Sequence, residues 1–325
     1  MRFAIVGSNF VAEWFVAAAK ECENVVLQTA FSRTREQARR NAEKWGTRSA
    51  CWDWEELRRD GNVDAVYIAS PNAFHFQQVE SMLLAGKHVL CEKPIVPSEK
   101  ELEPLLALAR ERGLLLLEAM RPAHLPALET IRELLPKLGT LRYAEFPYAQ
   151  YSSRYERFQQ GIVENAFDPT LANGTLIDLG VYCAHWMVML FGEPRRVVSL
   201  ASFIDGSIDT NGSALCDYGS MQVNLRYSKV HQSWRPAIIE GEEGSLSLSP
   251  LPVPAQAELR LRNGETTLIP LGTREWDMAY EINRFLELAQ NPAQAEPYHR
   301  WTRMTLRVMD AIRAQNGIDF TKRKH

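Results

Sequence analysis

The sequence predicts an α/β chain in two parts: a doubly wound parallel sheet, then an α+β part built on a mostly antiparallel sheet. Up to about residue 120, short apolar runs alternate with segments of helical spacing, as right-handed βαβ crossovers require. After residue 120, longer stretches alternate like half-buried strands. A chain of 325 residues is long enough for about two domains. We therefore expect domains at 1–120 and 121–325.

The first part is expected to contain five strands with a helix between each pair. Apolar runs place the strands at 3–6, 25–31, 63–69, 88–91 and 114–118. Helical spacing places the helices at 11–20, 35–45, 74–85 and 98–112. Gly86 and Gly113 follow the last two helices, where glycine commonly ends a helix.

The second part begins with a helix near 127–138. Alternating apolar and polar residues then predict five strands, at 140–151, 195–204, 213–227, 235–249 and 258–270. Two closing helices are expected near 275–289 and 300–315, separated by Asn291-Pro292.

Composition argues against several classes of protein. The formal net charge is −3, so no overall basic field favours nucleic acid or an anionic membrane. No uncharged apolar stretch reaches the ~18 residues of a membrane-spanning helix. The five cysteines are odd in number and lack C-x-x-C spacing, which favours a reducing cytoplasm over disulfides or structural zinc. The seven histidines show no paired metal-ligand spacing, so no metal is expected.

The turn after the first strand resembles a dinucleotide-binding fingerprint, G-x-G-x-x-G/A. Gly7 and Ala12 fit that pattern, but Asn9 stands where the second glycine would let backbone approach a pyrophosphate. An ordinary strand–helix turn is the alternative. The cofactor contacts expected here are Gly7, Ser8, Asn9, Phe10 and Val11.

The second strand ends at Ser32-Arg33-Thr34, where an NAD site usually has an acidic residue for the ribose 2′-hydroxyl. Hydroxyl and guanidinium groups suit a 2′-phosphate instead, so these residues favour NADP, with NAD still possible. The alternative for Arg33 is a solvated side chain at a helix start.

Two further motifs follow strands of the parallel sheet, at the edge where such sheets bind ligands. The first contains Ser70, Pro71 and Asn72, with His75 three residues later; Asn72 could contact the cofactor or cap the next helix. The second contains Glu92 and Lys93, followed by Pro94. A lysine there can touch a substrate oxygen and assist proton transfer. All six residues other than Pro94 are candidate cofactor contacts.

In the second part, Asp178, Tyr182 and His185 recur at i, i+4 and i+7, on one helical face. This places a carboxylate, a phenol and an imidazole side by side as candidate substrate contacts. The alternative is an amphipathic helix with Tyr182 partly in the core and His185 bonded internally.

Three segments together carry a resemblance to a known family: 70–75 (SPNAFH), 86–94 (GKHVLCEKP) and 178–182 (DLGVY). The chain resembles the glucose-fructose oxidoreductase / inositol dehydrogenase / MocA family, Gfo/Idh/MocA. The resemblance implies an N-terminal Rossmann domain and a C-terminal α+β domain for substrate binding and dimerisation, whose large, open, mostly antiparallel sheet commonly forms a dimer interface. It also implies NAD or NADP, with Lys93 as the catalytic lysine and Asp178 in the substrate pocket.

Tyr182 departs from the inositol dehydrogenases, which have histidine four residues after the aspartate. It resembles the glucose-fructose oxidoreductase and dimeric dihydrodiol dehydrogenase branches, in which the tyrosine is the proposed general acid. The hypothesis is hydride transfer between nicotinamide and a carbonyl or hydroxyl carbon of a sugar, polyol or related dicarbonyl or diol. Tyr182 would exchange the proton, Lys93 would stabilise its phenolate, and Asp178 would hold Lys93 or a substrate hydroxyl.

Two other functions are compatible with the same residues. One is an NAD-dependent glycosidase that oxidises its sugar only transiently. The other is a non-catalytic nucleotide-binding regulator, since fold does not imply function. The expected partners are a small-molecule substrate and a second copy of the chain, in a homodimer or dimer of dimers.

Overall fold

The computed structural model describes residues 1–204, 208–272 and 274–320, and the chain forms two compact units. The first unit contains Met1–Arg121 together with Arg274–Arg300. Of the described residues, the second contains those of Pro122–Gly272 and Trp301–Phe320. The first unit thus runs to Arg121 and also includes α9 (Met278–Gln290), the helix expected near 275–289.

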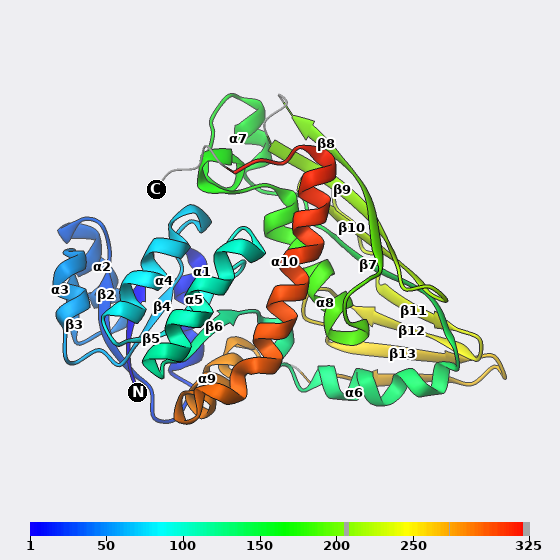
Figure 1. Ribbon diagram of the computed structural model, residues 1–325, viewed down its shortest axis with the longest axis horizontal. Coiled ribbons are helices and arrows are strands. Elements are labelled where there is room, and N and C mark those ends of the chain that lie inside the picture. The colour runs from blue at the N-terminus through cyan, green and yellow to red at the C-terminus, as the bar shows by residue number, and fades with distance from the viewer. Residues whose placement is uncertain (205–207, 273, 321–325) are drawn as a thin grey trace. The chain divides into compact units, whose positions relative to one another are not determined.

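Six parallel strands form the sheet of the first unit, in the order β3-β2-β1-β4-β5-β6 (Figure 1). The central strand β1 pairs with β2 on one side and β4 on the other, so the order reverses there. The strands are β1 (Arg2–Val6), β2 (Val26–Phe31), β3 (Ser49–Cys51), β4 (Ala65–Ile68), β5 (His88–Glu92) and β6 (Leu116–Ala119). This doubly wound topology brings the ends of β1, β2, β4 and β5 to one edge of the sheet.

The helices of this unit are α1 (Phe10–Ala19), α2 (Arg35–Trp45), α3 (Trp54–Arg59), α4 (His75–Leu84), α5 (Glu99–Arg112) and α9 (Met278–Gln290). Sequence analysis did not find β3 or α3, because three and six residues are too short to show a period. Thr34 caps α2, its hydroxyl oxygen accepting from Gln37 N at 3.3 Å, and Gly46 and Gly113 end α2 and α5 in the left-handed conformation.

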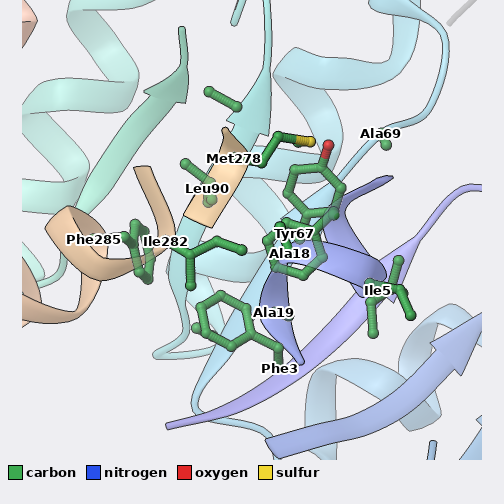
Figure 2. Close-up of a cluster of buried hydrophobic side chains, with 14 of the residues drawn as sticks. Phe3, Ile5, Ala18, Ala19, Tyr67, Ala69, Leu90, Met278, Ile282 and Phe285 are labelled. Carbon is green, nitrogen blue, oxygen red and sulfur yellow. The ribbon is translucent and has the colours of Figure 1, made fainter. Parts of the chain in front are cut away.

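The core explains why α9 belongs to this unit. Phe3 and Ile5, two apart on β1, point to the same face of the sheet and contact Phe15 of α1 and Tyr67 of β4. Figure 2 shows Met278, Ile282 and Phe285 of α9 in the same cluster. These three residues have helical spacing, and all are at most 2% exposed. Their burial fixes α9 here despite its distance along the chain.

The second unit is built on an eight-stranded sheet, in the order β14-β13-β12-β11-β7-β10-β9-β8 (Figure 1). The β7–β10 pair is parallel and the others are antiparallel, as expected of a mostly antiparallel sheet. The strands are β7 (Leu141–Ala149), β8 (Arg196–Ile204), β9 (Ile208–Asp217), β10 (Gln222–Ser228), β11 (Ala237–Gly241), β12 (Gly244–Ser249), β13 (Gln256–Leu261) and β14 (Thr266–Pro270).

Three of the expected long strands were wrong: 213–227, 235–249 and 258–270 are each a hairpin or the end of one. A turn at Gly219 (φ +86°) separates β9 from β10, and one at Gly264 (φ +95°) separates β13 from β14. Between β11 and β12 the turn contains Glu242 and Glu243. In the first two of these hairpins the buried residues change phase across the turn, between Cys216 and Val223 and between Ile239 and Leu246, and sequence analysis overlooked that change.

The helices of the second unit include α6 (Ala127–Leu134), α7 (Tyr155–Gln159), α8 (Val181–Phe191) and most of α10 (Glu296–Asn316). A π-helical turn, η6 (Leu176–Gly180), directly precedes α8. Within the described residues, Pro169–Phe191 is the one helical stretch long and apolar enough to cross a membrane, and 83% of its apolar window is buried inside the protein, as a core helix would be.

Candidate functional site

Gly7, at the end of β1, adopts φ +129°, a conformation that side chains rarely permit. A Cβ added there would lie 2.6 Å from the carbonyl oxygen of Ala69, which follows β4. The turn therefore requires glycine because β1 and the end of β4 approach so closely. The next three residues are exposed, so their backbone at the start of α1 is accessible to a ligand.

Asn9, the departure from the glycine pattern, has two structural partners. Its Oδ1 accepts from Ala12 N at 3.0 Å as the N-cap of α1, and its Nδ2 donates to Ala69 O at 3.1 Å. The side chain thus caps the helix and joins it to β4, with no need for a positive φ (its φ is −92°). Beside it, Phe10 is half exposed and packs edge-on against Trp14, while Val11 is partly buried against the core.

The hydroxyls of Ser8 and Ser32 lie 3.0 Å apart, joining the turn after β1 to the end of β2. Asn41 of α2 donates to both at 3.1 Å and itself accepts from Gln37 at 2.7 Å. Only one hydroxyl proton is used between the two serines, so the other can be donated to a ligand. Sequence analysis missed Asn41; its signal was a polar residue on the buried stripe of α2, between Ala38 and Trp45.

Arg33 and Thr34 are exposed directly after β2. Among the described residues, no side chain bonds or ion-pairs with the Arg33 guanidinium. Glu36, the first carboxylate after the strand, is paired with Arg40 at 2.6 Å. The donor set at this strand end is therefore cationic and hydroxylic, which fits an anionic phosphate better than a ribose hydroxyl.

The 70–75 motif is more internal than expected. The Ser70 hydroxyl donates to Gln78 at 2.5 Å, and Asn72 begins a 3₁₀ turn. His75 is wholly buried, with its ring nitrogens 2.9 Å from Ser70 O and 3.0 Å from Pro94 O, and burial lowers its pKa. His75 therefore joins the loops after β4 and β5, and we leave it out of the proposed cofactor contacts.

Glu92 is the last residue of β5, and Lys93 follows it. The Tyr67 hydroxyl donates to Glu92 Oε1 at 2.5 Å, and Lys93 N donates to Oε2 at 3.2 Å, so Glu92 fixes the backbone that carries Lys93. Burial raises the pKa of Glu92. Glu281 of α9 is fully buried with neither carboxyl oxygen hydrogen-bonded, and burial, then the charge of Glu92, raises its pKa far above the ordinary range.

Asp178 lies in the π-helical turn η6, with its side chain 40% exposed. Its Oδ2 is 3.1 Å from the ammonium of Lys229, a lysine that is almost fully buried. The turn itself is held by Asp209, whose Oδ2 accepts from Leu176 N at 2.7 Å. Neither Lys229 nor Asp209 was a candidate from the sequence, because nothing in the spacing links them to Asp178.

Tyr182 is 9% exposed in the first turn of α8, and its ring packs edge-on against Tyr148 of β7 at 5.8 Å. His185 does not share this position. It is 1% exposed, its Nδ1 lies 2.9 Å from the Thr305 hydroxyl of α10, and its Nε2 has no hydrogen-bond partner among the described residues. We therefore leave His185 out of the proposed substrate site. The described residues also contain no group of three or more metal-ligating side chains.

Two family models match the chain, one for each part. Residues 1–120 match "Oxidoreductase family, NAD-binding Rossmann fold" and residues 129–247 match "GFO/IDH/MocA C-terminal domain". The similarity to a curated member extends further. The chain is 36% identical over 320 residues to scyllo-inositol 2-dehydrogenase (NADP(+)) IolU of Bacillus subtilis, covering 98% of each protein.

The chain belongs to the Gfo/Idh/MocA family of oxidoreductases. A second Gfo/Idh/MocA relative, trans-1,2-dihydrobenzene-1,2-diol dehydrogenase of Mus musculus, is 28% identical over 342 residues and is covered to 99% by the whole chain. Among solved structures, KijD10, a 3-ketoreductase from Actinomadura kijaniata in complex with NADP and TDP-benzene, superposes with a TM-score of 0.87 at 22% identity, covering 97% of this chain and 98% of that one. At that identity the superposition shows the shared fold alone.

Proposed function

We propose that this protein is an NADP-dependent dehydrogenase or reductase acting on a sugar, polyol or related diol or dicarbonyl. The observation that carries the proposal is the 36% identity over nearly the full length to an NADP-dependent inositol dehydrogenase. The partly exposed Asp178 carboxylate, four residues before Tyr182, and the cationic end of β2 supply compatible chemistry. A cyclic polyol is the substrate class closest to that relative's.

The residues proposed to hold the cofactor come from the ends of β1, β2, β4 and β5. Gly7, Ser8, Asn9, Phe10 and Val11 bring the pyrophosphate to the start of α1. Arg33, with the hydroxyls of Thr34 and of the Ser8–Ser32 pair, binds the 2′-phosphate. Residues near the nicotinamide end are proposed to be Ser70, Pro71, Asn72, Glu92 and Lys93.

When bound, the nicotinamide would supply or accept the hydride. The residues of the chain position the substrate and exchange a proton with its oxygen. Tyr182 exchanges a proton with the substrate oxygen. A phenol's ordinary pKa of ~10 is high for this role, and the ammonium of Lys93 favours the phenolate. Asp178 accepts a hydrogen bond from a substrate hydroxyl or from Lys93. This hydrogen bond holds the reacting carbon of the substrate in position.

The test is steady-state turnover with NADPH, NADH and their oxidised forms against inositols, aldoses, ketoses, dicarbonyls and dihydrodiols. We expect NADP(H) to be preferred, and Lys93→Met and Tyr182→Phe each to lose most of the turnover. Arg33→Ala should raise the KM for NADPH more than that for NADH. Arg40→Ala is the matched control, because Arg40 is also exposed, on the helix that follows Arg33, but is paired with Glu36. Saturation by NADH alone would reject the cofactor assignment, and full turnover by Tyr182→Phe would reject the acid role.

We also propose a homodimer or dimer of dimers formed through the large sheet. Val198 and Leu200 stand two apart on β8, so their side chains project from the same face, and Leu215 pairs with Val198 from β9. The three are 53%, 76% and 45% exposed and form an exposed apolar patch on this strand pair. A cytoplasmic location is supported by the cysteines, since all five are free thiols.

A further inference from the structure

Lys229 follows β10, and its side chain is only 3% exposed. Its Nζ lies 3.1 Å from Asp178 Oδ2, donates to Ala166 O at 2.9 Å, and lies 5.4 Å from the centre of the Phe167 ring. Burying an ammonium is costly unless its donors are satisfied. Here a carboxylate, a carbonyl and a ring face surround it, so the charge has one well-defined place.

The backbone holds Lys229 as firmly as its side chain does. Lys229 N donates to Thr210 O at 3.1 Å, and Lys229 O accepts from Ser152 N at 2.8 Å. The strand that contains Thr210 also contains Asp209, which holds the first residue of η6. Both ends of the Lys229–Asp178 pair are therefore fixed relative to β9.

The residues around Asp209 are packed too closely for the start of η6 to adopt a second position. A Cβ at Gly174 would lie 1.9 Å from Asp209 Oδ1, and the Thr175 hydroxyl donates to Asp209 O at 2.9 Å. The start of η6 is thus fixed within a small tolerance. Asp178, two residues after the start of η6, has little freedom beyond its own side-chain rotation, and the bond to Lys229 restricts that rotation.

Asp178 and Lys229 differ in burial, and this difference indicates that they have different roles. The Asp178 carboxylate is 40% exposed and can meet a ligand, whereas the Lys229 ammonium cannot reach one except through Asp178. This differs from Lys93, which lies at a strand end in the first unit.

We propose that Lys229 is a positioning residue that keeps the Asp178 carboxylate ionised and in one orientation for the reaction. Through Ala166 O, the same ammonium also fixes the segment after α7 beside that carboxylate. The inference rests on the proposed function for its kinetic consequence, but the Lys229–Asp178 coupling itself can be measured without turnover.

The test compares Lys229→Gln, which keeps hydrogen-bond donors but removes the charge, with Lys229→Arg, which keeps the charge. Lys87→Gln is the matched control: Lys87 is another buried lysine, in the first unit, and its Nζ donates to the carbonyls of Asp60 and Val63. All variants are first checked for folding by circular dichroism and for NADPH binding by fluorescence titration.

We expect Lys229→Gln to lower kcat/KM by roughly tenfold with NADPH affinity unchanged within about twofold, and to move the acid limb of its pH profile to higher pH. A carboxylate that loses its neighbouring cation takes up a proton more readily, which sets the direction. Lys229→Arg, which keeps the charge, should have nearly the pH profile of kcat/KM that wild type has. Lys87→Gln should lower the melting temperature without shifting the pH profile of kcat/KM. Wild-type kinetics and pH dependence in folded Lys229→Gln would overturn the inference and leave the proposed function intact.

A second measurement is independent of activity. Carbon NMR of labelled aspartate carboxyls, with the signal assigned by Asp178→Asn, follows the Asp178 titration in wild type and in both Lys229 variants. We expect Asp178 to titrate at higher pH in Lys229→Gln than in wild type and Lys229→Arg. Equal titration in all three would overturn the inference. If wild type turns over no substrate but the titration shifts as expected, the proposed function fails while the coupling stands.

Discussion

Replacing His185 should remove a defined part of the acid sensitivity of the fold. Burial, with a smaller contribution from the charge of His124, lowers the pKa of His185 from 6.5 to about 3. The unfolded chain therefore takes up this proton below about pH 6.5, whereas the folded chain does not until about pH 3. Stability is fully present above the unfolded pKa and is lost as pH falls between these two values.

The magnitude follows from the two pKa values. Between about pH 7.5 and about pH 5, proton uptake by the unfolded state alone costs about 2 kcal/mol of unfolding free energy. His185→Phe keeps a planar ring in the same space but cannot titrate, so its stability should fall by about 2 kcal/mol less than that of wild type over this range. Its stability at neutral pH should be lower, because the Thr305 hydrogen bond is lost.

Urea unfolding at each pH, followed by tryptophan fluorescence and circular dichroism, provides the assay. Thr305→Val is the matched control: it removes the hydrogen-bond partner but keeps the buried imidazole, so it should retain the steep pH dependence of wild type. Parallel stability curves for wild type and His185→Phe would refute the reasoning, because they would mean that His185 takes up its proton equally in the folded and unfolded states.

Three further predictions test other parts of the structure. The raised pKa of Glu281 means that its contribution to stability is present in acid and is lost as pH rises above 4.5 toward the folded-state pKa. Glu281→Gln should therefore gain up to about 1.4 kcal/mol per pH unit over wild type in that window, measured by denaturant unfolding; equal slopes would mean an ordinary carboxyl. Gly7→Ala should cost about 1–3 kcal/mol, since its Cβ would meet Ala69 O at 2.6 Å, whereas Gly61→Ala, with open space around it, should cost much less; equal melting temperatures for the two would contradict this. Leu200→Glu should shift the protein from dimer to monomer in light scattering while the loop variant Val163→Glu, also at an exposed apolar residue, does not; an unchanged mass would place the interface elsewhere.

Local patterns predicted much of the architecture. The strand–helix alternation of the first part and the mostly antiparallel character of the second were both confirmed, because period 2 and period 3.6 are properties of neighbouring residues. The motifs at the ends of β1, β2, β4 and β5 were found for the same reason: in a parallel sheet, each lies where its own strand ends. Short turns inside an alternating segment, such as that at Gly219, were overlooked, although the buried positions change phase there from Cys216 to Val223.

The sequence by itself determined the family, through three short segments, and the positions of Lys93, Asp178 and Tyr182 on their elements. Only the tertiary structure decided what surrounds such residues. Asn9 bonds to Ala69, sixty residues away; His185 bonds to Thr305 of α10; and Asp178 is held by Lys229, which follows β10. Spacing reveals which face of a helix a residue occupies. The partner it meets depends on packing between segments distant in the chain, because burial forces each polar group to find whatever donor or acceptor that packing brings near.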